Sequence, residues 1–390
     1  MNKFLPEEEL EQRISRIREM AVETGYDAVL ISTNANIYYT SGYVFSGFVY
    51  VSVDGGCLFF VHRPVGLEHE KVVYVRKPEQ IAEKLESMGR KLPEKLGLEL
   101  GRIPYLQALR LAAAFSQREL LDCSALLAKA RSVKTDFELE KLKKSGVHHC
   151  QSYSRISGLF HEGMTDKEFQ IEIEHRLRLD GCLGQFRIAG GSMELFMGNL
   201  LVGENADEPS PYDFAMGGEG LDNSLPVGCN DSIMRPGNSV MIDMNGNFTG
   251  YMTDMTRTYY VQRIDDKAKA AHNLSISIHR ALSDFIRPGV EAKAAYELAK
   301  KMADDAGFSD YFMGHRQKAG FIGHGVGIEV NELPVIAPKS RDVFEKGNVI
   351  ALEPKFVIPG TGAVGIENTY VVGDDGLECI TDFPEELSEL

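Results

Sequence analysis

Four acidic residues in the second half of the chain stand where strand-like patterning calls for apolar side chains. Asp243 and Asp254 each follow three residues typical of a strand, and Glu353 and Glu367 each end a run rich in Val, Ile and Ala. An isolated carboxylate buried in such a segment costs several kcal/mol, so it must be paired or bind a metal ion. The alternative for any single acid is an edge-strand or solvent-facing position. Four acids in two pairs favour a shared polar site.

The spacing of Glu353 and Glu367 predicts that their side chains converge. If the two residues face each other across an antiparallel pair, the midpoint of their connection is residue 360, inside Pro359-Gly360-Thr361-Gly362. This run is a strong turn sequence. Facing residues project their side chains to the same side of a sheet, so the two carboxylates are expected to meet.

The spacing of Asp243 and Asp254 leaves two arrangements open. Directly facing aspartates need a turn centred between Phe248 and Thr249, which requires a loop at about residues 247–250. The obvious turn dipeptide is instead Asn245-Gly246, whose tight hairpin pairs residue 243 with residue 248 and separates the two carboxylates.

His324 is the fifth candidate, because it stands between glycines in the run Gly323–Gly327. A lone histidine is usually structural, but flanking glycines let the backbone and solvent approach the imidazole closely. Four carboxylates and one imidazole form a hard, oxygen-rich set suited to manganese, iron or cobalt, with zinc as a further option. Two bridged divalent ions match the charge of four carboxylates, and such a pair activates a water nucleophile and polarises a carbonyl.

The surrounding elements predict how these residues are held. Residues 1–130 mix strands and helices as an α/β domain, with a hairpin turn at Asp54-Gly55-Gly56. From residue 131 the expected order is helices, strands, helices and strands, which favours an α+β domain with an antiparallel sheet. The expected helices cover 136–160, 166–180, 266–286 and 291–306, and the expected strands cover 239–244, 251–262, 348–358 and 363–373. Capping boxes at Thr135-x-x-Glu138 and Thr165-x-x-Glu168 begin the first two helices.

Composition excludes several classes of protein. The 390 residues are 43% hydrophobic and 25% charged, which predicts two folded domains rather than disorder. With 42 basic against 57 acidic residues and a net charge of −15, a nucleic-acid partner is not expected. No apolar run approaches the roughly 18 residues of a membrane span. The six scattered cysteines and the acidic start without an apolar leader favour a reduced, cytoplasmic protein.

Four motifs of this chain resemble the M24 metallopeptidase family, above all its Xaa-Pro dipeptidases and aminopeptidases. They are MIDMNGNFTGYMTDMTRT at 241–258, GHGVG at 323–327, ALEP at 351–354 and GIENT at 365–369. The resemblance covers about residues 131–390 and implies the catalytic fold called pita-bread. Residues 1–130 resemble the smaller creatinase/prolidase-type N-terminal domain.

The resemblance also implies roles for individual residues. It makes Asp243, Asp254, His324, Glu353 and Glu367 the five ligands of a site for two divalent ions, with Asp254 and Glu367 as the bridging pair. Glu353 is then also the catalytic group that carries a proton from the water nucleophile to the leaving nitrogen. Arg257, which matches the arginine after the second aspartate, is implied to support the ligands. A homodimer is expected from the resemblance and the two-domain layout.

The substrate-binding residues of the family are replaced. Val227, Gly320 and Asn331 stand where the family's peptidases carry histidines, and Gly365 stands where an arginine is common. These groups normally bind the substrate carboxylate or stabilise the tetrahedral intermediate, and losing one oxyanion donor typically costs about 10²–10³ in rate. His315, in an apparent insertion, is a candidate substitute, with a surface-loop histidine as the alternative.

Three hypotheses therefore stand after the sequence. The first is a metallohydrolase of Xaa-Pro peptidase type that cleaves small peptides. The second is a non-peptidase M24 enzyme that cleaves a C–N or related bond in a small metabolite, which the replaced histidines favour. The third is a catalytically silent binding homologue, against which the intact ligand set argues.

Overall fold

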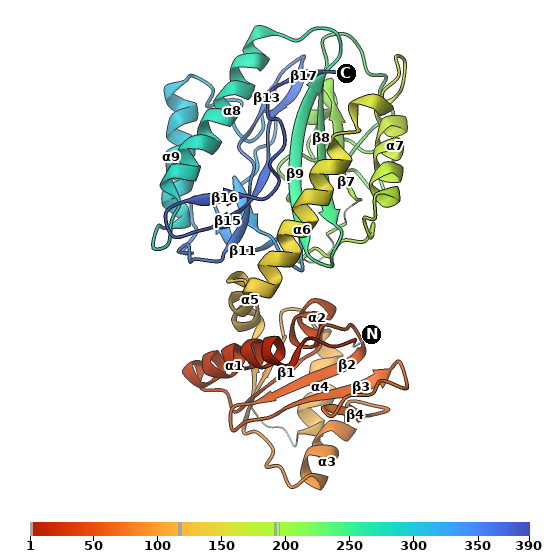
Figure 1. Ribbon diagram of the computed structural model, residues 1–390, viewed down its shortest axis with the longest axis vertical. Helices are drawn as coiled ribbons and strands as arrows, with labels where there is room; N and C mark the ends of the chain where they lie inside the picture. Colours follow the sequence, from red (N-terminus) through yellow and green to blue (C-terminus); the bar gives the residue numbers. More distant parts are fainter. Residues whose placement is uncertain (1–2, 116–118, 191–192, 195) are drawn as a thin grey trace. The chain divides into compact units, whose positions relative to one another are not determined.

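The computed structural model describes residues 3–115, 119–190, 193–194 and 196–390. The chain divides into two compact units, Met1–Arg131 and Ser132–Leu390 (Figure 1). The first is a smaller α/β unit and the second an α+β unit built on antiparallel sheets, which confirms the predicted fold class. Among the described residues, no helix combines the length and the apolar character needed to cross a membrane.

The first unit is built on one mixed sheet. From Glu7 to Ser132 the elements are α1 (Glu7–Thr24), β1 (Ala28–Ile31), α2 (Asn34–Ser41), β2 (Ser46–Ser52), β3 (Cys57–Arg63), β4 (Val72–Tyr74), α3 (Gln80–Ser87), β5 (Lys95–Leu98), α4 (Tyr105–Ala114), β6 (Glu119–Asp122) and α5 (Ser124–Ser132). The strand order is β4-β3-β2-β1-β5-β6. β2 and β3 pair antiparallel up to Val51 and Cys57, so the hairpin predicted at residues 54–56 is confirmed.

The described residues of the second unit form three sheets and four long helices. Its elements are α6 (Asp136–Tyr153), a 3₁₀ turn (Ser157–Leu159), α7 (Asp166–Leu179), β7 (Gly198–Val202), a second 3₁₀ turn (Gly203–Asp207), β8 (Ser239–Asn247), β9 (Met252–Tyr260), α8 (Asp266–Phe285), α9 (Ala292–Asp305), β10 (Gly323–Gly325), β11 (Glu332–Ile336), β12 (Val349–Leu352), β13 (Lys355–Ile358), β14 (Gly362–Gly365), β15 (Asn368–Val372), β16 (Leu377–Cys379) and β17 (Ser388–Glu389). The sheet orders are β17-β9-β8-β7, β11-β10-β12-β15-β16 and β13-β14.

Both predicted capping boxes are confirmed at the starts of α6 and α7. The Thr135 hydroxyl accepts a hydrogen bond from the Glu138 backbone N–H, and the Glu138 side chain accepts one from the Thr135 backbone N–H. Thr165 and Glu168 make the same reciprocal pair. Because such a box satisfies two otherwise unpaired N–H groups, it fixes where the helix begins. α6 ends at Tyr153, so the predicted helix over 136–160 is too long.

The two strands predicted at 348–358 and 363–373 are each divided in two. β12 and β13 are separated by Glu353 and Pro354, and β14 and β15 by Ile366 and Glu367. Proline has no N–H to donate to a ladder, which accounts for the break after Glu353. The interruption leaves each glutamate between two sheets rather than within one.

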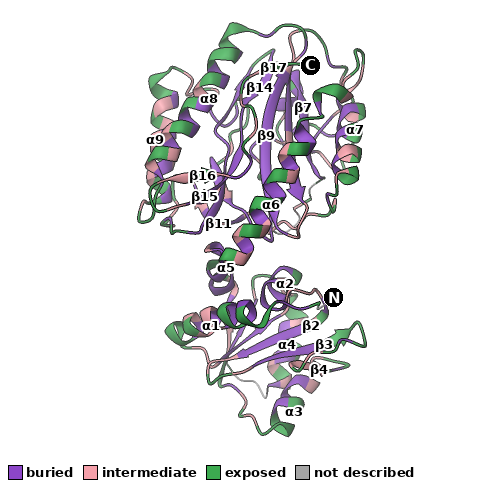
Figure 2. Cartoon of the chain, viewed as in Figure 1, coloured by how far each residue is buried: buried purple, intermediate pink, exposed green. Residues whose placement is uncertain are grey.

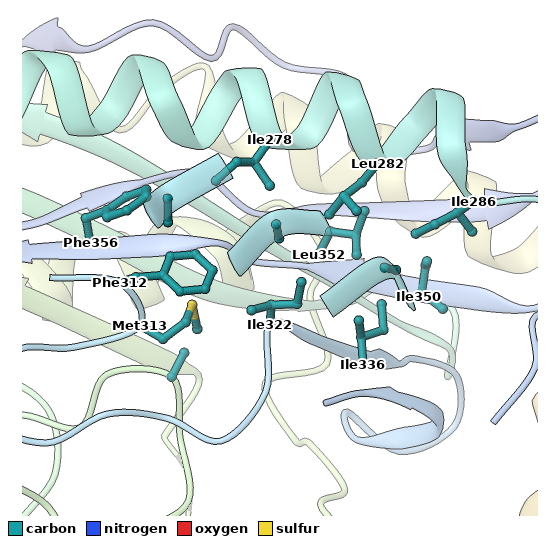
Figure 3. Close-up of a cluster of buried hydrophobic side chains, with 14 of the residues drawn as sticks. Ile278, Leu282, Ile286, Phe312, Met313, Ile322, Ile336, Ile350, Leu352 and Phe356 are labelled. Carbon is teal, nitrogen blue, oxygen red and sulfur yellow. The ribbon is translucent and has the colours of Figure 1, made fainter. Parts of the chain in front are cut away.

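Apolar packing under α8 and α9 holds the sheets in place. Ile278 and Leu282 on α8, and Ile286 directly after its end, recur every fourth residue and are buried in one cluster with Ile350 and Leu352 of β12 (Figure 3). Each fully buried aliphatic side chain of this kind contributes about 1.5–3 kcal/mol. Figure 2 shows the strands of this unit buried and the outer faces of the helices exposed. The polar centre described next therefore lies on a rigid, apolar support.

Candidate metal centre

Glu353 and Glu367 lie opposite each other, as their spacing predicts. Leu352 pairs with Asn368 on one side of them and Lys355 with Gly365 on the other, so both ladders share a register centred on residue 360. The two glutamates occupy the matching positions between these ladders. A backbone bridge between Glu367 and Thr256 ties this point to β9.

Asp243 and Asp254 do not face each other directly, so that arrangement is wrong. Asp243 pairs with Thr256, and Asp254 pairs with Asn245, which offsets the two aspartates by two residues on the same face of the β8–β9 hairpin. The hairpin turns at residues 248–251, where the Gly250 N–H donates to the Asn247 side chain over 3.1 Å. The dipeptide Asn245-Gly246 lies within β8 and makes no turn. The two carboxylates are diagonal neighbours, which still lets them share a site.

His324 reaches the same site from β10, the strand between β11 and β12. Its Nε2 lies 3.5 Å from a carboxylate oxygen of Glu353 and 4.0 Å from one of Asp254. The flanking glycines serve strand packing, because a Cβ at Gly323 or Gly325 falls 2.3 or 2.1 Å from a carbonyl oxygen of a neighbouring strand. Burial opposes the charged imidazolium, but the hydrogen bond and charge of Glu353 outweigh it and raise the pKa of His324.

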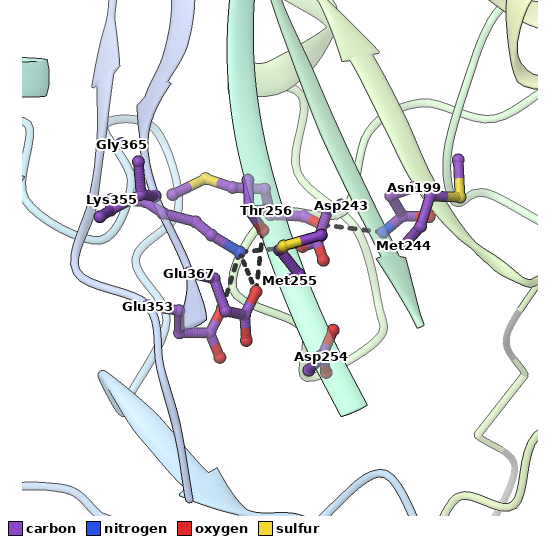
Figure 4. A network of polar contacts seen from close by, with 12 residues as sticks. Asn199, Asp243, Met244, Asp254, Met255, Thr256, Glu353, Lys355, Gly365 and Glu367 are labelled. Carbon is purple, nitrogen blue, oxygen red and sulfur yellow. Dashed lines mark hydrogen bonds and ion pairs between the residues drawn. The ribbon is translucent and has the colours of Figure 1, made fainter. Parts of the chain in front are cut away.

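Lys355 is a member of this site that sequence reasoning missed. Its Nζ lies 2.8 Å from Asp243 Oδ2, 2.9 Å from Glu353 Oε2 and 3.0 Å from Glu367 Oε2 (Figure 4). The side chain is fully buried. The sequence does contain a sign of it, because Lys355 begins the otherwise apolar segment 355–358. A lysine in such a segment is as unexpected as the four acidic residues in theirs.

The carboxylates differ sharply in their surroundings. Burial raises the pKa of Glu353, but the neighbouring charges of Lys355 and His324 outweigh that effect and lower it. Burial, followed by repulsion from the other carboxylates, raises the pKa of Glu367 and raises that of Asp254 well above its usual range. The Glu367 carboxylate also accepts a hydrogen bond of 2.8 Å from the Thr256 hydroxyl. Asp254 Oδ1 is buried and has no hydrogen-bond partner among the described residues.

The donor atoms fall into two groups that could each hold a metal ion. One consists of Asp254, His324 and Glu367, and the other of Asp243, Glu353 and Glu367. Within each group the donor atoms lie within 4.8 Å of one another. Carboxylate oxygens with an imidazole nitrogen suit first-row divalent ions. The first group contains the unpartnered Asp254, whereas all three carboxylates of the second group contact Lys355.

The donor atoms open into a cavity of about 80 Å³. Ile188, Phe214, Met216, Phe321 and Val330 form an apolar part of its wall. Asn199 and Asn245 also line it, and the side-chain oxygens of both are buried without a partner among the described residues. The cavity thus combines an apolar wall with a floor of hydrogen-bond acceptors.

The three remaining candidate residues have different positions. Asn331 lines the cavity, but its amide donates to the Ala189 carbonyl over 2.8 Å and accepts from the Ala189 N–H over 2.6 Å. It therefore holds a wall segment in place. His315 contacts Asp207 through Nδ1 at 2.8 Å and stacks on Tyr311, so the structure places it in a surface loop.

Arg257 acts on the ligands through the backbone. Its Nη1 donates to the carbonyl oxygens of Thr256 and Glu367 over 2.8 and 2.9 Å, and its Nη2 donates to the Asn368 side chain over 2.8 Å. It also donates to the carbonyls of Phe383 and Pro384 over 2.8 Å each. This buried guanidinium fixes the segment that carries Glu367.

Comparisons with known proteins agree with this geometry. Residues 13–133 match the model of the creatinase/prolidase N-terminal domain. The chain is 27% identical to the uncharacterized peptidase YqhT of Bacillus subtilis over 96% of this chain and 99% of that protein. It is 25% identical to the Xaa-Pro dipeptidase of Pyrococcus furiosus over 97% of this chain and 100% of that protein.

Solved structures are similar over the same length. The Xaa-Pro dipeptidase from Bacillus anthracis superimposes with a TM-score of 0.81 at 25% identity, covering 98% of this chain and 100% of that chain. Residues 140–374, more than half of the sequence, match the model of metallopeptidase family M24. These matches confirm the resemblance drawn from the four motifs, and the chain belongs to metallopeptidase family M24.

Proposed function

We propose that this protein is a metal-dependent hydrolase of small peptides of the Xaa-Pro type. The observation that carries the proposal is the convergence of Asp254, His324 and Glu367, with a buried and unpartnered oxygen on Asp254. A buried acceptor without a donor is costly, and a divalent cation supplies the missing partner. Manganese, cobalt, iron and zinc all accept this donor set. Residues 131–390 form the catalytic domain in this proposal, and residues 1–130 the accessory one.

Glu353 is the group that we propose moves the proton. Its carboxylate lines the cavity, is hydrogen-bonded to Lys355 and lies 3.5 Å from His324, which keeps it ionised and able to accept a proton. A divalent ion at such a site supplies Lewis acidity towards a carbonyl and a water molecule. Glu353 then accepts a proton from the water and delivers it to the leaving nitrogen.

The acceptors on the cavity floor suit a substrate rich in donors. With Asp254 assigned to the metal ion, the side-chain oxygens of Asn199 and Asn245 remain unpartnered among the described residues. The amino group of a short peptide carries the donors that these oxygens lack. The dipeptidase relatives act on Xaa-Pro substrates according to their names, which supports the same class of substrate for this chain.

The test is proline release from a panel of Xaa-Pro dipeptides and tripeptides. The protein is loaded with Mn²⁺ or Co²⁺, and metal content is measured in the same sample. We expect turnover that needs the metal and is lost in Glu353→Gln, whose amide cannot accept the proton. The matched control is Glu329→Gln, because Glu329 is also buried but does not belong to either donor group.

A second function is favoured by two observations. The positions of three family histidines hold Val227, Gly320 and Asn331, and the cavity of about 80 Å³ is small for a peptide. Both fit a non-peptidase M24 enzyme that cleaves a C–N bond in a small metabolite. Full metal occupancy without proline release from any peptide supports this alternative and contradicts the peptidase.

We also propose a homodimer, on the basis of the family resemblance and the two-unit layout, and a cytoplasmic location, on the basis of the scattered free cysteines. Light scattering of the purified protein tests the assembly. A monomeric mass contradicts it.

A further inference from the structure

We propose that the ammonium group of Lys355 takes the place of one of the two metal ions, so that each chain binds a single divalent ion. That ion is held by Asp254, His324 and Glu367. The inference rests on the proposed function, because it concerns the same centre. It replaces the two-ion site expected from the resemblance with a mixed site of one metal ion and one fixed organic cation.

The position of the Lys355 nitrogen is the first argument. Nζ lies 2.8, 2.9 and 3.0 Å from one oxygen each of Asp243, Glu353 and Glu367, the three residues of the second donor group. A divalent first-row ion binds carboxylate oxygens at about 2.0–2.2 Å, at the same point between them. The ion and the ammonium cannot occupy that point together.

Backbone contacts fix the position from which the lysine side chain extends. Lys355 pairs with Gly365 across the β13–β14 hairpin, and its carbonyl accepts a hydrogen bond of 2.9 Å from the Met313 N–H. Gly365 makes room for it, since a Cβ at Gly365 falls 3.0 Å from the Lys355 Cα. From this backbone position the side chain is fully buried, with its nitrogen among the three carboxylates.

Charge gives the second argument. Four carboxylates converge on the centre, and one divalent ion with one ammonium leaves a single negative charge. Two divalent ions in addition to the ammonium leave a single positive charge and place three cations in one buried site, where repulsion between cations is poorly screened. The lysine therefore disfavours the second ion even at a slightly different position.

The first donor group remains open to a metal ion. Figure 4 shows Asp254 apart from the dashed contacts that surround Lys355. Its Oδ1 is unpartnered among the described residues, and its Oδ2 faces His324 Nε2 at 4.0 Å. The ammonium of Lys355 thus contacts all three carboxylates of the second donor group, whereas Asp254 in the first donor group still lacks a cation.

The experiment measures how many Mn²⁺ ions each chain binds. The chelated full-length protein is dialysed against increasing Mn²⁺, and bound metal is counted by mass spectrometry and by electron paramagnetic resonance. We expect one ion per chain at saturation, with the spectrum of isolated Mn²⁺. Lys355→Ala removes the ammonium and opens its space, so we expect two ions per chain and the spectrum of an exchange-coupled pair.

Lys134→Ala is the matched control. Lys134 is also buried and paired with a carboxylate, that of Glu332 at 3.1 Å, but outside both donor groups. We expect this variant to bind one ion, as the unaltered protein does. Circular dichroism of each variant confirms that it is folded.

Three other outcomes would contradict either the inference or the proposed function. Two ions with an exchange-coupled spectrum in the unaltered protein overturn the inference but leave the metal-dependent hydrolase standing. A folded Lys355→Ala variant that still binds one ion shows that the lysine does not occupy the second position. No bound Mn²⁺ in the unaltered protein, together with no turnover under any metal, contradicts the proposed function itself.

Discussion

Replacing Asp254 with asparagine is expected to stabilise the metal-free protein while abolishing its response to metal. Asp254 is 5% exposed, and its Oδ1 has no partner among the described residues. Without metal the fold therefore carries the cost of an unpaired buried carboxyl group, either as a charge beside Glu367 and Glu353 or as the proton uptake that its raised pKa implies. Asparagine has the same shape, lacks the charge, and offers donors to those neighbouring carboxylates.

The magnitude follows from these contacts. Relief of the unpaired acceptor contributes about 1–3 kcal/mol, which is the usual cost of leaving such a group unsatisfied. For a unit of this size, each kcal/mol raises the Tm by about 2–4 °C. The unaltered protein gains about 2.7 kcal/mol from a metal ion at a hundredfold excess over its Kd, and the variant loses that gain.

The assay compares thermal unfolding of both proteins in a chelator and in Mn²⁺. We expect Asp254→Asn to unfold at higher temperature than the unaltered protein in chelator, with no further shift on adding metal. Asp166→Asn is the control, because Asp166 is also buried but accepts hydrogen bonds from the backbone N–H groups of Lys167 and Asn230 over 2.8 and 3.1 Å. That variant should lose stability and keep its metal response. A lower Tm of Asp254→Asn in chelator would refute the reasoning.

Three further outcomes are expected. Stability to urea, measured in chelator, should fall between pH 7 and pH 5. Burial lowers the pKa of His149, His272 and His279 to about 3, 4 and 3, while the unfolded chain takes up protons below about 6.5, so each histidine contributes a loss of up to about 1.4 kcal/mol per pH unit. The raised pKa values of Asp254 and Glu367 act in the opposite sense over the same range, so the net fall is smaller than the sum for the three histidines, and an unchanged or rising urea midpoint would contradict the prediction. Arg257→Met should lower the free energy of unfolding by about 2–4 kcal/mol in urea titrations, because the guanidinium donates hydrogen bonds to the carbonyls of Glu367, Phe383 and Pro384. A change smaller than the error of the titration would show that these hydrogen bonds do not stabilise the fold. His315→Ala should change stability by no more than about 0.5 kcal/mol and leave turnover as it is, because the side chain lies in a surface loop against Asp207; a loss of turnover would place it in the site.

The sequence alone was sufficient for the features that depend on local chemistry. The turn Pro359–Gly362 determines the β13–β14 register, and that register places Glu353 opposite Glu367. The capping boxes at Thr135 and Thr165 determine where two helices begin. Both follow from short-range backbone hydrogen bonding, which a run of a few residues encodes. The four motifs shared with the M24 family predicted the fold of the second unit.

The offset of Asp243 and Asp254 was not available from the sequence. Two turn positions were compatible with the β8–β9 spacing, and the structure uses residues 248–251. The side chain of Asn247 stabilises this longer turn, a contact that hairpin dipeptide rules do not consider. A shift of two residues keeps both carboxylates on the same face of the hairpin. The two aspartates therefore still lie near each other, although neither predicted pairing is correct.

The sequence by itself determined five of the residues that meet at the candidate centre, because charged side chains within apolar strands are costly unless they share a partner. Only the tertiary structure decided what that partner is. Lys355 is far from Asp243 in the chain, and the meeting of the β13–β14 hairpin with β8 brings its nitrogen within 2.8 Å of that carboxylate. Strand periodicity gives the face on which a side chain lies, whereas the packing of three separate sheets sets which faces converge.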